Sequence, residues 1–147
     1  MNDDRQRRRL ADWSFLYARA TLGIAFLSGI ADRFGLWRGR NVGYGNFAGF
    51  IRYTAKVNSF MPASSIPLLA WTATIAELVL GIFLLAGVWL RWTALASALL
   101  LILFGTAMAI SFGLKSPLDY SVFSASATAI LLALNGGRTS GTQSSVL

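Results

Sequence analysis

The sequence predicts an all-α integral membrane protein built as an antiparallel bundle of four transmembrane helices. Of its 147 residues, 55% are hydrophobic and 13% are charged, whereas about a quarter of the residues of a soluble domain are charged. Four long apolar stretches are separated by more polar segments. The chain has no cysteine and no histidine, which excludes thiol chemistry, disulfides, and zinc or haem ligation by Cys or His of this chain.

The basic residues are spread over tails and loops around the apolar stretches. The chain carries 13 Lys and Arg and a formal net charge of +7, but no basic helix face that would predict nucleic-acid binding. Residues 1–13 form a polar segment that we expect to be a cytoplasmic tail, and the apolar run after it is too long for a signal peptide. Four arginines cluster in this tail: Arg5, Arg7, Arg8 and Arg9.

The first span is expected over residues 14–34, with Trp13 and Tyr17 at one membrane interface. It contains Arg19, which can extend outward to the interface or turn inward toward an acid. The connection 35–65 follows, and its apolar residues recur with helical spacing over about 46–60. This pattern predicts a short amphipathic helix at the membrane surface. It fits a helix without a ligand, and also a lid over a cavity.

The second span is expected over residues 66–90, and Glu77 lies at its middle. The tight turn at Arg91 makes it an antiparallel neighbour of the third span, 92–112. The fourth span is expected over 117–134, and residues 135–147 form a Ser/Thr/Gly-rich tail that we expect to be disordered.

Four spans place both termini on one side of the bilayer. Six basic residues fall on that side and five on the other, so the positive-inside rule discriminates weakly. The dense arginine cluster at the N-terminus favours cytoplasmic termini.

Glu77 is the main candidate for a functional residue. A carboxylate at the middle of a span costs several kcal/mol unless it is paired, protonated or hydrated. We expect Arg19, about 7 Å from the midplane by helical rise, to pair with it, and Thr74 to share its helix face. The pair is open to two interpretations: a structural lock of helix register, or a polar pocket for a quinone headgroup, a proton or a small polar ligand.

A second polar cluster is expected at the outer surface. It consists of Asp32, Arg33, Lys115, Asp119 and Tyr120. These residues could instead be solvated helix caps and interfacial salt bridges. No set of metal ligands is predicted in the chain.

Two segments resemble a known family. Residues 19–29, RATLGIAFLSG, are similar to the first-helix pattern of the DoxX family of small four-helix bacterial membrane proteins. AELVLG at 76–81 with LLAG at 84–87 resembles its second-helix pattern, and the similarity extends over about 14–134. The stretch 32–35, DRFG, departs from the family, because most members carry a Lys at that helix end. No role is therefore carried over to that position.

The resemblance implies a multi-pass protein of the bacterial plasma membrane, associated with complexes that oxidise thiosulfate or quinol or respond to oxidative stress. We therefore expect a non-catalytic accessory or quinone-contacting subunit, with the lipid bilayer, a redox protein or a second copy of the chain as partners. One alternative is a structural or assembly factor without a ligand, and another is a small transporter that uses Glu77. An enzyme acting alone ranks last, since no nucleophile–base pair or metal set is visible.

Overall fold

The structure, a computed structural model, describes residues 2–39 and 42–135. These ranges contain helices and no strand, so the all-α prediction is confirmed. The predicted C-terminal tail lies almost wholly outside the described residues. The elements in chain order are α1 (Asn2–Arg33), α2 (Phe47–Val57), the 3-10 turn η1 (Ala63–Ser65), α3 (Ile66–Ala86), α4 (Leu90–Phe112), α5 (Lys115–Asp119) and α6 (Val122–Asn135).

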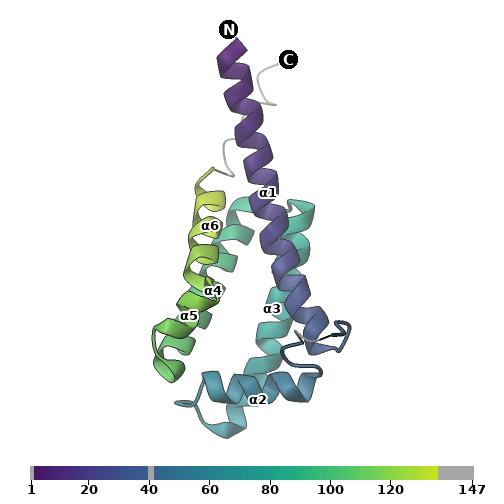
Figure 1. The fold of residues 1–147 in the computed structure, drawn as a ribbon, viewed down its shortest axis with the longest axis vertical. Coiled ribbons are helices and arrows are strands. Elements are labelled where there is room, and N and C mark those ends of the chain that lie inside the picture. The colour runs from purple at the N-terminus through teal and green to yellow at the C-terminus, as the bar shows by residue number, and fades with distance from the viewer. Residues whose placement is uncertain (1, 40–41, 136–147) are drawn as a thin grey trace.

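α1 is longer than the span predicted from the sequence. The segment expected to be a separate polar tail continues the helix toward the N-terminus, and this part projects beyond the other helices (Figure 1). Two acids in the first turn, Asp3 and Asp4, face the positive end of the helix dipole. Arg7 adds an ion pair to Asp3 one turn away, at 3.3 Å. Local electrostatics therefore favours helix where the hydropathy pattern shows only a polar tail.

Three helical segments are long and apolar enough to cross a membrane: Asp3–Arg33, Ala63–Ala86 and Leu90–Phe112. The fourth predicted span is interrupted. α5 ends at Asp119, Ser121 adopts a positive φ of 54°, and α6 then runs for only 14 residues. α6 is thus about 21 Å long. The four-span bundle, with α6 as its fourth member, stays a prediction.

The long helices pack in two main pairs. α1 lies along α3, α4 lies along α6, and α3 adjoins α4 across a tight turn. Gly87 caps α3 in the left-handed conformation (φ 73°), which glycine adopts without steric cost. α2 lies crosswise at the end of the molecule opposite to the N-terminus (Figure 1). The prediction of a helix in this connection is confirmed as α2, whereas its place at the membrane surface stays a prediction.

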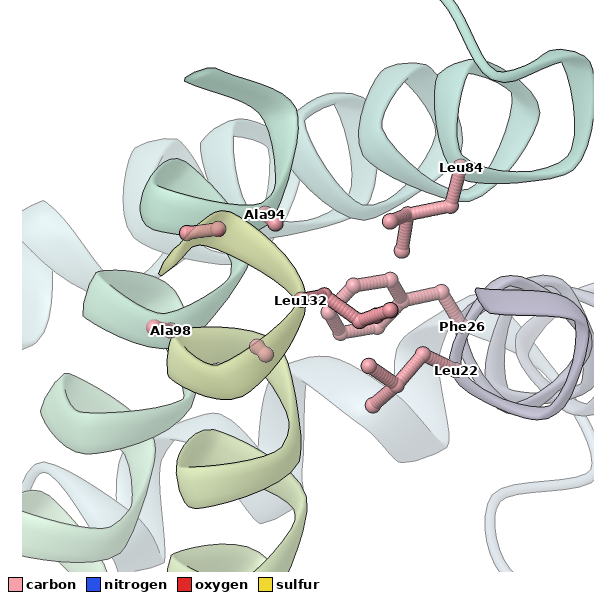
Figure 2. Close-up of a cluster of buried hydrophobic side chains, with 8 residues drawn as sticks. Leu22, Phe26, Leu84, Ala94, Ala98 and Leu132 are labelled. Atoms are coloured by element: carbon pink, nitrogen blue, oxygen red, sulfur yellow. The ribbon is translucent and has the colours of Figure 1, made fainter. Parts of the chain in front are cut away.

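α1 and α3 approach so closely that their backbones touch. A Cβ added at Gly23 would lie 2.8 Å from Cγ of Leu85 and 3.0 Å from the carbonyl oxygen of Gly81. Small residues allow such contact between membrane helices, where dispersion and polar contacts replace the hydrophobic effect. Beside this contact lies the apolar core that joins the two helix pairs (Figure 2). Its labelled members are Leu22, Phe26, Leu84, Ala94, Ala98 and Leu132.

The close contact sets a register in which α1 ends beside the middle of α3. Gly29 lies against Glu77, with 3.6 Å from an added Cβ to Oε2 of the carboxylate. Arg33, the last residue of α1, reaches Thr74 and Glu77. Since α3 begins at Ile66, about 12 Å of it extends past the end of α1. α2 packs against this extension.

Candidate functional site

The site is organised by a buried ion pair between α1 and α3. Nη2 of Arg33 donates to both carboxylate oxygens of Glu77, at 2.7 Å to Oε1 and 2.8 Å to Oε2. Both side chains are 5% exposed. Such a pair is held together by the cost of stranding either charge away from water.

Thr74 is the third polar member. Nη1 of Arg33 donates to Oγ1 of Thr74 at 3.0 Å, and this hydroxyl donates in turn to the carbonyl of Ala70 at 2.8 Å. Nε of Arg33 is also buried, but it has no acceptor among the described residues. The Nε–H of the guanidinium is therefore a buried donor without a described acceptor.

An aromatic cluster adjoins the guanidinium through the ring of Phe50. The ring of Phe50 on α2 lies 3.7 Å from Cζ of Arg33, a cation–π contact. Tyr44 packs edge-on against Phe50 at 5.1 Å between centroids and against Tyr53 at 5.2 Å. We call Arg33, Glu77, Thr74, Tyr44 and Phe50 the ion-pair site.

The ionisation of Tyr44 is shifted by its surroundings. Burial, with a smaller contribution from Tyr53, raises the pKa of Tyr44 to about 12. Burial also raises the pKa of Tyr53. The Tyr44 hydroxyl therefore stays protonated at physiological pH and can donate a hydrogen bond.

Asp32 positions the loop that carries Tyr44. Its Oδ2 accepts from the backbone N–H of Gly43 at 3.0 Å and of Tyr44 at 3.1 Å. A carboxylate that accepts two backbone amides holds a loop more strongly than a neutral side chain does. Asp32 thus fastens the loop to the end of α1, next to the ion-pair site.

The predicted pairing of Arg19 with Glu77 is wrong, because Arg33 occupies that position. The Arg19 guanidinium lies against Gly87, at the end of α3. Gly87 follows Glu77 by ten residues, about 15 Å of helix, which is beyond the reach of an arginine side chain. Of the predicted trio, the structure brings Thr74 and Glu77 together and leaves Arg19 out.

The outer cluster does not form as one group. Arg33 is 4% exposed and belongs to the ion-pair site, while Asp32 binds the loop amides. Lys115 pairs with Asp119 one turn away in α5, and both side chains are exposed. Tyr120 is 72% exposed. The alternative interpretation, solvated caps and surface salt bridges, fits Lys115, Asp119 and Tyr120 and fails for Arg33.

Sequence reasoning missed the role of Arg33, although the sequence held a signal for it. Arg19 and Arg33 are 14 residues apart, which places them within about 40° on one helix face. Either could therefore face Glu77, and only the α1–α3 register decides. The contributions of Tyr44 and Phe50 had no comparable signal, because they depend on how the loop folds back.

No group of three or more Asp, Glu, His or Cys side chains that could hold a metal ion occurs within residues 2–39 and 42–135.

Comparison with known proteins places the chain in a family. A family model described as DoxX matches residues 14–112. No curated protein and no solved structure shows a significant match. The matched range covers α1 from its apolar part onward, the α2 region, α3 and α4, and therefore includes every residue of the ion-pair site. With two thirds of its length matched and three helices able to cross a membrane, the chain is a membrane protein that belongs to the DoxX family.

Proposed function

We propose that this protein is a non-catalytic subunit of a membrane redox assembly and that it contacts a quinone headgroup at the ion-pair site. The proposal includes a place in the bacterial plasma membrane with both termini in the cytoplasm. The arginine-rich part of α1 and Arg91 are on the same side of the apolar spans in this arrangement, in keeping with the positive-inside rule.

The observation that carries the proposal is the unused Nε–H of Arg33. A quinone offers two carbonyl oxygens, which accept hydrogen bonds, and a flat ring, which stacks on aromatic side chains. A buried donor without an acceptor costs about 1–3 kcal/mol, and a quinone carbonyl would satisfy it. The protonated Tyr44 hydroxyl supplies a second donor nearby.

The experiment is quinone retention by the full chain extracted in native lipid discs. Quinone is extracted from the purified discs and quantified by chromatography against protein. Tyr44→Phe keeps the aromatic packing and removes one donor, so retention should fall severalfold. Tyr120→Phe, at an exposed tyrosine, is the matched control and should retain quinone like the wild type. Quinone content equal to that of empty discs, or equal in all three proteins, would contradict quinone contact.

The assembly part of the proposal is tested separately. Purification in mild detergent should yield this chain together with a flavin-, haem- or thiol-containing protein. Recovery of this chain alone from a host that expresses it naturally argues against an accessory role.

A second candidate is a structural factor without a ligand. It is favoured by one observation: both oxygens of Glu77 are already engaged by Arg33, as expected for a lock of helix register. In that case Glu77→Gln destabilises the fold, and the wild type itself retains no quinone and co-purifies with no redox protein.

A further inference from the structure

Arg19 is the one residue of the predicted polar pair that the ion-pair site does not use. Its guanidinium fills the space left by the missing side chain of Gly87, where an added Cβ would collide with Nη1. It therefore lies at the α3–α4 turn, at the opposite end of the α1–α3 contact from Arg33.

No described protein group neutralises Arg19. Its Nε is buried without an acceptor in the part of the chain that the structure describes, and no described carboxylate forms a salt bridge with it. Four of the six acids have other partners. Asp3 pairs with Arg7, Asp32 with loop amides, Glu77 with Arg33 and Asp119 with Lys115; Asp4 and Asp12 lie on the projecting part of α1.

This end of the molecule carries the marks of a membrane interface. Arg91 follows Gly87 by four residues, and the turn between them leads into α4. Exposed aromatic residues gather on α1 and on the turn, as Trp and Tyr do at the headgroup level. They are Trp13, Tyr17, Trp89 and Trp92, which are 68–76% exposed.

We propose that Arg19, seated against Gly87, forms a binding site for a phosphate group at the membrane interface, and that the phosphate belongs to an anionic phospholipid. A guanidinium matches phosphate with two parallel N–H···O bonds. Packing against Gly87 restricts the Arg19 side chain before a ligand binds, which reduces the side-chain entropy lost on binding. The site is separate from the ion-pair site and does not depend on quinone contact.

The experiment is lipid retention measured by native mass spectrometry. The full chain is reconstituted with equal amounts of phosphatidylglycerol and phosphatidylcholine, and the lipids retained as detergent is stripped are counted. The wild type should retain phosphatidylglycerol preferentially. Arg19→Gln should lower that preference about fivefold, the effect expected of one basic residue at an anionic headgroup.

Arg52→Gln is the matched control, since it removes the same charge from an exposed position on α2 and should keep the preference. An equal loss in both variants overturns the site, because it would reflect net charge alone. If Arg19→Gln does not fold, the wild type alone tests the proposal, because equal retention of both lipids by the wild type overturns it.

A final measurement adds inorganic phosphate to the wild type with its retained lipid. Displacement of the retained lipid by millimolar phosphate overturns lipid as the occupant, whereas retention in its presence supports it.

Discussion

The two arginines on α1 share a helix face and end in opposite environments. Arg33 is 4% exposed, bound to Glu77 and Thr74 and covered by Phe50. Arg19 is partly exposed at the α3–α4 turn and has no acidic partner among the described residues. The difference follows the burial of the two side chains. A partly exposed arginine can extend its charge toward polar surroundings, whereas a buried one needs a carboxylate beside it.

Breaking the ion pair should have the largest effect. Glu77→Gln leaves the Arg33 charge buried without its counter-ion and should lower the free energy of unfolding by about 3 to 5 kcal/mol. Arg19→Gln should change it by less than about 1 kcal/mol. Denaturant unfolding in detergent micelles, followed by circular dichroism, measures both.

The double variant Arg33→Met/Glu77→Leu sharpens this test. Because it removes both charges, it should recover most of the stability lost in Glu77→Gln. If Glu77→Gln and Arg19→Gln cost the same, the contrast between the two ends of α1 is wrong.

The register that separates the two arginines depends on the close contact at Gly23. Gly23→Ala places a methyl group against Leu85 and the Gly81 carbonyl and should cost about 1 to 3 kcal/mol. Gly29→Ala is the matched control. Its Cβ would meet Oε2 of Glu77 at an ordinary 3.6 Å, and the gain in helix propensity offsets any strain. In thermal unfolding, Gly23→Ala should have the lower unfolding temperature of the two variants. A lower unfolding temperature for Gly29→Ala would contradict the close contact at Gly23.

Asp32 fixes the loop at the Arg33 end only. Asp32→Ala removes the acceptor of two backbone amides and should cost about 1.5 kcal/mol. Hydrogen exchange at Gly43 and Tyr44 should speed up, while exchange around Arg19 should not. Asp119→Asn, which breaks an exposed pair in α5, should cost at most about 0.5 kcal/mol. Faster exchange throughout the chain would instead indicate global destabilisation.

An effect confined to alkaline pH is expected from Tyr44. Because the pKa of Tyr44 is raised to about 12 in the fold, from about 10 in an unfolded chain, the folded state holds this proton more tightly. Its contribution to stability is complete below about pH 10 and is lost as the pH rises toward about 12. Tyr44→Phe should reduce the drop in unfolding temperature between about pH 9 and pH 11.

Composition and hydropathy were enough to predict a membrane protein, because an apolar run of about twenty residues is typical of a transmembrane helix. They also located Glu77 and Thr74, since a buried carboxylate stands out in an apolar span. The partner of Glu77 could not be predicted. It depends on how far α1 slides along α3, and that is decided by the backbone contact between Gly23 and Gly81.

The interruption of the fourth predicted span at Ser121 could not be predicted from the sequence either, because a positive φ at serine is set by its surroundings. The helical N-terminal extension was missed for a different reason. Hydropathy reports burial, and this part of α1 is exposed.

The length of α6 has a consequence for the surrounding membrane. A hydrocarbon layer is about 30 Å thick, and a helix of 14 residues covers about 21 Å of it. As a fourth span, α6 would create hydrophobic mismatch along one flank, which lipids relieve by thinning locally at a cost of fractions of a kcal/mol per Å. The stability of the protein would then depend on the length of the lipid acyl chains. Shorter chains would match α6, whereas longer chains would increase the mismatch on the α4–α6 side alone.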